Sequence, residues 1–457
     1  MALVLAAALL IGCGSSRSLS RHSRQPDAAL QQLGYGYGDA PAVAPPSQQG
    51  RQRQTPAVSP LVAELQSILA DTVLGFSQVG LSVVDVTAGG VLFEHRAQQR
   101  MRPASTQKVV TAITALDHLG PAYTFATRLM ATAPLEANGT LRGDLYLRGA
   151  MDPLLPAADV RRLAAALRQA GVREVRGRLI VDASLKDADE WGWGWCWDDD
   201  NPTLTPLLVG GKPQLAVAMQ NALRGAGVRV TVPATGSGTT PAGARELAAV
   251  RRPLTEVLQP MMKESDNLCA ESVFYQLGPT RDKAAAAIKE TLAAAAGAAA
   301  GGGAGEGAGG GAGAAGGGAW GGCDTAAYST GAAGRDLARI VVADGSGLSL
   351  YNYHTAASFT RLLAYAAARP DSILNPLLAS LPIAATDGTL SRRMVGTAAA
   401  GRVRAKTGSV TAVSSLVGYT TQRSTGHLIA FAIINNGVQT MAQGRALQDR
   451  ICIALSQ

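Results

Sequence analysis

One predicted helix constrains the fold of this chain more than any other stretch, because it begins at a candidate nucleophile. Pro103 ends an extended segment, and apolar residues then recur at helical spacing until Gly120 stops the pattern. Ser105 is therefore predicted to lie at a helix N-terminus. Lys108 follows one turn later on the same helical face.

This pairing of a serine with a lysine has a chemical meaning. A hydroxyl is a poor nucleophile until a base removes its proton, and a neutral lysine can be that base. The helix N-terminus stabilises the oxyanion that forms when the hydroxyl attacks a carbonyl group. However, Ser-x-x-Lys also occurs by chance, as an N-cap serine followed by a solvated lysine. Other residues of the chain are needed to distinguish these two explanations.

The remaining patterns predict a protein of mixed helices and strands. Helices are predicted for residues 60–72, 159–170, 214–225, 254–263, 358–368 and 443–455, and strands for 79–86, 91–95, 125–131, 143–149, 177–182, 403–409, 414–420 and 427–435. We predict a β-rich inserted domain at 121–250, between two parts of one discontinuous domain at 61–120 and 251–457. Within the insertion, tryptophans at every second position from Trp191 to Trp197 favour one face of an extended segment, with a local peculiarity as the alternative.

Residues 284–322 are almost entirely alanine and glycine. The alanine-rich start is compatible with an extended helix, but the glycine-rich remainder buries too little apolar surface to become ordered. We therefore predict a flexible surface insertion at 284–322 that carries no chemistry.

Residues 1–60 predict a targeting segment followed by a disordered linker. A short apolar run ends in Leu10, Ile11, Gly12 and Cys13, which resembles the lipobox of bacterial lipoproteins, although no basic residue precedes it. Lipidation of that cysteine gives membrane association through the N-terminus. The next stretch is rich in serine and arginine and free of acids until Asp27, as in organelle transit peptides. Both interpretations imply export, to a bacterial periplasm or envelope or to a plastid.

Composition excludes several classes of function. The net charge of +8 is spread along the chain, without a basic block interleaved with aromatic residues, so we predict no nucleic-acid binding. The five cysteines form no CxxC pair and no Cys/His cluster, so we predict no metal site. Beyond the N-terminus, no stretch is long and apolar enough to span a membrane.

Three short motifs follow one another along the chain, and their order at wide separation is rare by chance. They are Ser105-Thr106-Gln107-Lys108, Ser265-Asp266-Asn267 and Lys406-Thr407-Gly408, and together they resemble the active-site set of the penicillin-recognising serine acyl-transferases. The flanking residues at 265–271, 344–349, 387–390 and 406–409 resemble the D-alanyl-D-alanine carboxypeptidase/endopeptidase family typified by penicillin-binding protein 4 (peptidase family S13). The resemblance extends from about residue 61 to the C-terminus, without the alanine/glycine tract. It implies an α+β fold of the penicillin-binding-protein/β-lactamase-like transpeptidase type, an antiparallel sheet with helices, with an inserted β-rich domain that is reduced in this chain.

The resemblance also implies an activity and a set of site residues. The expected enzyme is a serine-type D-Ala-D-Ala carboxypeptidase, with DD-endopeptidase activity as an addition, that acts on peptidoglycan stem peptides through an acyl-enzyme. It needs no cofactor and is inhibited by β-lactams. The expected catalytic residues are Ser105 as nucleophile, Lys108 as general base, Ser265 as proton relay and Asn267, which holds Lys108 and the substrate. The expected substrate-binding residues are Lys406 and Thr407 for the terminal carboxylate, Gly408, Ser409 for the oxyanion hole, and Asp152 for the amino group of the peptide side chain. Lys406 is also expected to help keep Lys108 neutral.

Two alternatives stay open. A β-lactamase shares the three motifs but needs efficient deacylation, and the inserted domain and the loop at Asp344 favour the peptidase. A degenerate homologue kept as a binding or scaffold protein is compatible with the shortened insertion, but the complete set of motifs argues against it.

Overall fold

The computed structural model describes residues 59–71, 75–232, 235–300 and 337–457. The targeting segment and linker predicted up to residue 60, including Cys13, therefore lie outside the described residues, except for residues 59 and 60. Most of the glycine-rich part of the alanine/glycine tract also lies outside them.

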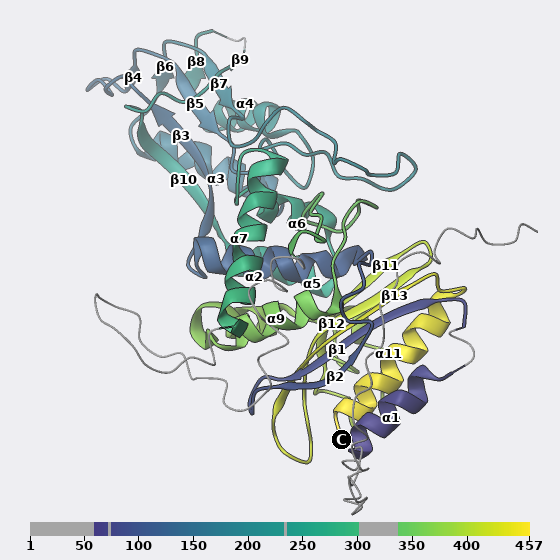
Figure 1. Ribbon diagram of the computed structural model, residues 1–457. Coiled ribbons are helices and arrows are strands. Elements are labelled where there is room, and N and C mark those ends of the chain that lie inside the picture. Colours follow the sequence, from purple (N-terminus) through teal and green to yellow (C-terminus); the bar gives the residue numbers. More distant parts are fainter. Residues whose placement is uncertain (1–58, 72–74, 233–234, 301–336) are drawn as a thin grey trace, which may run out of the picture. The chain divides into compact units, whose positions relative to one another are not determined.

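A five-stranded antiparallel sheet is the centre of the fold, and its strands lie in the order β11-β12-β13-β1-β2 (Figure 1). The strands are β1 (Gln78–Asp85), β2 (Val91–His95), β11 (Arg404–Val410), β12 (Val413–Thr421) and β13 (Leu428–Asn436). Buried strands need apolar residues on both faces, and β13 has them in alternation. Phe431 and Ile433 pack into one core cluster, whereas Ala432 and Ile434 pack into another.

Two terminal helices cover one face of this sheet (Figure 1). They are α1 (Pro60–Leu69) and α11 (Met441–Leu455). Leu65 of α1 and Leu447 and Ile451 of α11 pack with Phe431 of the sheet. The strand β11 forms one edge of the sheet and lies next to α2.

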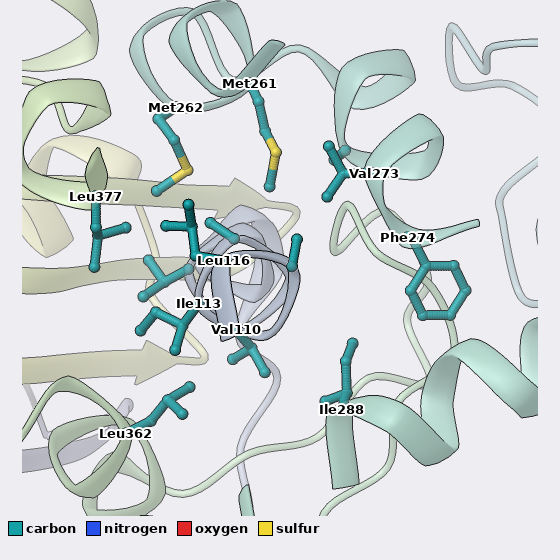
Figure 2. Close-up of a cluster of buried hydrophobic side chains, with 14 of the residues drawn as sticks. Val110, Ile113, Leu116, Met261, Met262, Val273, Phe274, Ile288, Leu362 and Leu377 are labelled. Carbon is teal, nitrogen blue, oxygen red and sulfur yellow. The ribbon is translucent and has the colours of Figure 1, made fainter. Parts of the chain in front are cut away.

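The helix α2 (Gln107–Leu119), which begins at the first motif, is buried from Gln107 to Leu116. A helix that is buried on all sides needs neighbours in every direction, and Figure 2 shows side chains of several other helices around it. These helices are α5 (Leu254–Lys263), α6 (Asn267–Phe274), α7 (Arg281–Ala300), α9 (Ala356–Ala367) and α10 (Asn375–Ser380). The position of Ser105 is therefore fixed by the main hydrophobic core.

The prediction of a flexible insertion at 284–322 is wrong for residues 284–300, because α7 continues to Ala300. Ile288 and Leu292 are buried against the main core, together with Ala284 and Ala295. Alanine has the highest helix propensity, and its small side chain allows the helix to approach its neighbours closely. The alanine-rich start is therefore a core helix.

The region between α2 and α5 has a hydrophobic cluster of its own. Its larger sheet has the order β10-β3-β5-β7-β9, and a smaller parallel sheet has the order β4-β6-β8. The elements are β3 (Thr124–Ala131), β4 (Thr140–Leu141), β5 (Leu145–Arg148), α3 (Ala157–Gln169), β6 (Glu174–Val175), β7 (Leu179–Asp182), α4 (Leu215–Gly225), β8 (Arg229–Val230), β9 (Gly236–Ser237) and β10 (Arg245–Pro253). The strand β10 was not predicted, because its charged and small residues show no clear alternation of apolar and polar positions.

The tryptophan tract is not an extended segment. It forms turns in which Trp195 is 7% exposed, whereas Trp191, Trp193 and Trp197 are 51%, 49% and 88% exposed. None of the helices among the described residues combines the length and apolar content that crossing a bilayer requires.

Candidate active site

Ser105 lies in a strained turn at the start of α2. The short helix η2 (Ala104–Thr106) precedes α2 directly, and the hydroxyl of Thr106 donates to the carbonyl oxygen of Pro103 over 2.7 Å. Ala104 has a φ of +50°, which costs a residue with a Cβ about 1–2 kcal/mol. Such strain persists only where the surrounding structure enforces it, and it is frequent at functional sites.

Lys108 connects the first two motifs. Its Nζ lies 3.0 Å from Ser105 Oγ, 2.8 Å from Asn267 Oδ1 and 2.8 Å from the carbonyl oxygen of Ser346. The side chain is fully buried, and burial lowers the pKa of Lys108 to about 8, although the nearby carboxyl groups of Asp344 and Glu271 oppose this shift. At pH 7 about a tenth of the amine is therefore neutral and can accept a proton from the adjacent serine, and this fraction rises with pH.

A buried loop fixes the third acceptor of Lys108. Glu271 Oε1 accepts the backbone N–H groups of Gly345 and Ser346 at 3.1 and 2.8 Å, and the carbonyl of Ser346 then faces Lys108. Burial and the neighbouring Asp344 raise the pKa of Glu271 to about 8. The loop is thus held in place by a side chain of α6.

Asp344 ties this loop to more distant residues. Its carboxylate accepts hydrogen bonds from the Nε1 of Trp195 at 2.8 Å and from the Nδ2 of Asn352 at 2.7 Å. It also accepts the backbone N–H groups of Gly347 and Ser349. The one buried tryptophan of the tract therefore has a structural contact with the site.

The amine of Lys406 contacts Ser265 of the second motif and is not exposed to solvent. Its Nζ donates to Ser265 Oγ at 2.9 Å and to the carbonyl oxygen of Thr407 at 2.7 Å, and the side chain is 0% exposed. Ser265 itself has a φ of +66°. Burial, and then the charge of Lys108, lower the pKa of Lys406 well below its ordinary value.

The edge strand β11 packs directly on the turn that holds the nucleophile. A Cβ atom at Gly408 would lie 2.6 Å from the carbonyl oxygen of Pro103, 3.0 Å from the amide nitrogen of Thr106 and 3.2 Å from that of Ser105. Only a glycine allows this approach. The strand and the turn together place the backbone of Ser409 near the nucleophile.

A cavity of about 520 Å³ opens at this junction. It is lined by Ser105, Ser265, Thr407 and Ser409, and by residues of the 388–393 segment and of α11. The structure therefore brings together the predicted residues of all three motifs.

Asp152 does not join them. It is 3% exposed and does not line this cavity. Its carboxylate lies 3.7 Å from Nε of Arg252 and accepts the backbone N–H of Leu154. Burial raises the pKa of Asp152 to about 6. This geometry gives no support to its expected role in binding the substrate.

Sequence reasoning assigned no function to Glu271 and Asp344. Both lie in the quoted flanking motifs, and Glu271 follows Asn267 by four residues, one turn along α6. That spacing is the signal that could have identified it. Among the described residues no group of three or more His, Cys, Asp or Glu side chains could hold a metal ion.

Comparisons with known proteins show which family and which fold the chain resembles. The chain matches the model of the D-Ala-D-Ala carboxypeptidase 3 (S13) family over residues 61–207, 211–302 and 319–457. It is 29% identical to a D-alanyl-D-alanine carboxypeptidase of Actinomadura sp., over 86% of this chain and 84% of that protein. The crystal structure of penicillin-binding protein 4 from Haemophilus influenzae has a TM-score of 0.66 at 22% identity, over 86% of this chain and 98% of that one. A second structure of that protein, in complex with a β-lactam, has a TM-score of 0.61, with the same identity and coverage. The predicted fold class is confirmed.

Proposed function

The chain belongs to the D-Ala-D-Ala carboxypeptidase 3 (S13) family, and we propose that it removes the terminal D-alanine from peptidoglycan peptides through an acyl-enzyme on Ser105. It is a serine-type D-Ala-D-Ala carboxypeptidase. The observation that carries the assignment of residues is the buried contact of Lys108 Nζ with both Ser105 Oγ and Asn267 Oδ1.

Acylation begins with proton transfer inside this contact. Lys108 takes the proton of Ser105 as Oγ attacks the carbonyl carbon of the D-Ala-D-Ala peptide bond. The carbonyl oxygen becomes an oxyanion, which the backbone N–H groups of Ser105 and Ser409 stabilise. Asn267 keeps the amine of Lys108 in place and binds the amide backbone of the substrate.

Collapse of the intermediate requires a proton on the departing nitrogen. Ser265 is positioned to donate its hydroxyl proton to this nitrogen and to be reprotonated by Lys406, whose Nζ lies 2.9 Å from its Oγ. The proton that Lys108 took from Ser105 then replaces the one that Lys406 gave up, so that Lys108 is neutral again before deacylation. The peptide C–N bond then breaks and D-alanine leaves. Water attacks the ester on Ser105 with Lys108 again as base, which releases the shortened peptide and restores the enzyme.

The expected ligands follow from the cavity. Thr407 lines it, and its hydroxyl binds the terminal carboxylate of the substrate. Lys406, which was expected to share this role, does not line the cavity, because its amine is buried and held by Ser265 and the carbonyl oxygen of Thr407. β-Lactams present a reactive carbonyl to the same serine, and we propose that they acylate Ser105. Cross-linked peptides with a D-alanyl bond are second substrates, which gives DD-endopeptidase activity. A β-lactamase function is not favoured by the family match, and a degenerate binding protein does not explain a buried, oriented general base.

The proposed substrate lies outside the cytoplasmic membrane, and the relatives support an exported, envelope protein. We propose two routes for the N-terminal segment. Lipidation of Cys13 anchors the protein to a bacterial membrane, whereas cleavage of a transit peptide delivers it to a plastid.

Release of D-alanine from a peptide that ends in D-Ala-D-Ala tests this function. The Ser105→Ala variant should lose at least about a thousandfold in kcat, since a triad-like nucleophile accounts for most of the catalysis. The Ser391→Ala variant is the matched control, because this exposed serine lines the same cavity and has no proposed role. Equal D-alanine release by the Ser105→Ala variant and the wild type contradicts the proposal.

A further inference from the structure

The cavity that Ser105 and Thr407 line also has arginine residues in its wall. These come from the segment that follows η6 (Gly388–Leu390) and from the first turns of α11. Arg392, Arg393 and Arg445 line it, and the other groups are mostly hydroxyls and backbone. No aspartate or glutamate lines the cavity among the described residues. Guanidinium and hydroxyl donors without acids favour an anion, and a carboxylate fits the planar fork of arginine.

One of these arginines is already paired, and the other two are free to bind. Arg393 donates to Asp449 Oδ1 at 2.6 Å and to Gln448 Oε1 at 3.0 Å. Arg392 and Arg445 are exposed, and neither side chain has a hydrogen bond or ion pair with any described residue. Two uncompensated charges therefore face the cavity.

The segment that carries Arg392 is anchored on both sides of it. Before it, Asp387 accepts from Lys263 Nζ at 2.6 Å, and the hydroxyls of Thr389 and Thr407 lie 2.9 Å apart. After it, Arg393 is fixed as described above. The third motif and Arg392 are thus held next to each other by hydrogen bonds.

The cavity wall also contains a polar atom that lacks a partner. Ser415 is 1% exposed and lines the cavity, and its Oγ has no hydrogen-bond partner among the described residues. A buried hydroxyl without a partner is costly, and a bound ligand atom would satisfy it. Lys406 does not supply the charge here, because its amine is buried and occupied by Ser265.

We propose that Arg392 and Arg445 form an anion subsite that binds a carboxylate of the leaving group. This inference rests on the proposed function, since it assigns a further substrate contact within the same cavity. The carboxylate comes either from the C-terminus of the departing residue or from the side chain of a longer or acidic departing residue, as in a cross-linked peptide.

Four substrates with the same acyl donor distinguish these two sources. Their leaving groups are D-alanine, D-alaninamide, D-glutamate and D-glutamine, so that each pair differs in one carboxylate. The measured quantities are the ratios of kcat/KM within each pair, for the wild type and for the Arg392→Gln/Arg445→Gln variant. The Arg402→Gln/Arg423→Gln variant is the control, because it removes the same charge at two exposed arginines that do not line the cavity.

We expect one of the two ratios to fall about five- to tenfold in the Arg392→Gln/Arg445→Gln variant, and neither ratio to fall in the control. A fall of this size is expected when a partly screened charged hydrogen bond is lost. A fall of the alanine ratio assigns the C-terminal carboxylate, and a fall of the glutamate ratio assigns the side chain. The affected wild-type ratio should also decrease as salt is raised from about 0.05 to 0.5 M, which needs no variant. If both ratios match the control and do not respond to salt, the anion subsite is refuted while the carboxypeptidase assignment stands. If the wild type cleaves none of the four substrates, the proposed function itself fails.

Discussion

The substitution Gly408→Ala tests whether the edge strand and the nucleophile turn form one unit. The added Cβ would meet three backbone atoms, the carbonyl oxygen of Pro103 at 2.6 Å and the amide nitrogens of Thr106 and Ser105 at 3.0 and 3.2 Å. Because backbone atoms cannot rotate away, β11 has to move outward by about 0.8 Å to restore ordinary van der Waals contact. This movement carries the N–H of Ser409 away from the proposed oxyanion.

The expected consequences are large for catalysis and moderate for stability. A misplacement of about 1 Å costs about a hundredfold in rate, and overpacking costs about 1–3 kcal/mol in the free energy of unfolding. The assay is the second-order rate constant of acylation by a fluorescent penicillin, with thermal unfolding as the measure of folding.

Gly243→Ala is the matched control. A Cβ at Gly243 meets nothing within 4 Å, and the backbone there has no positive φ. Its acylation rate should equal that of the wild type. If a folded Gly408→Ala variant also acylates at the wild-type rate, the packing of β11 on the turn has no part in catalysis and the reasoning is refuted.

Four further predictions concern the general base, its surroundings and the core. The rate of acylation should rise about tenfold between pH 7 and pH 9, with a midpoint near pH 8. The reason is that the pKa of Lys108 is lowered to about 8 and only the neutral amine accepts a proton. A rate that does not change over this range contradicts the role of Lys108. Glu271→Gln removes a carboxyl group that raises this pKa but leaves an oxygen acceptor for the loop, so the midpoint should move to lower pH; a midpoint that stays or rises refutes the coupling. Trp195→Phe removes the hydrogen bond to Asp344 and should lower the free energy of unfolding by about 1–3 kcal/mol in denaturant titrations, whereas an unchanged stability shows that the bond is dispensable. Ile288→Ala should cost about 2–5 kcal/mol in the same measurement, because α7 is part of the core; a neutral effect would support the surface insertion instead.

The catalytic helix and the central strands could be predicted because their sequences follow one period over many residues. The apolar spacing that follows Ser105 predicts a helix, and the short continuous apolar run at 428–434 is typical of a strand with two buried faces. The three motifs could be assembled into one site because the family resemblance supplied their partners. Spacing along the chain alone does not show that Lys108 reaches Asn267.

Other features depended on tertiary contacts that leave no local pattern. Alanine repeats in α7 are compatible with a loop or a helix, and only the packing of Ile288 against the core decides between them. The role of Glu271 arises from a loop about 75 residues later in the chain, whose N–H groups it accepts. Asp152 fits a short motif in the sequence, but in the fold its carboxylate faces Arg252.

The central claim is that Ser105 is the acylated nucleophile and that Lys108 activates it. Intact-mass measurement after incubation with a penicillin, followed by peptide mapping of the adduct, tests it most directly. We expect one covalent adduct per chain, located on Ser105. The Lys108→Ala variant should react much more slowly, because the buried amine that contacts Ser105 Oγ at 3.0 Å is lost. An adduct on any other residue, or a folded protein that forms none, contradicts it.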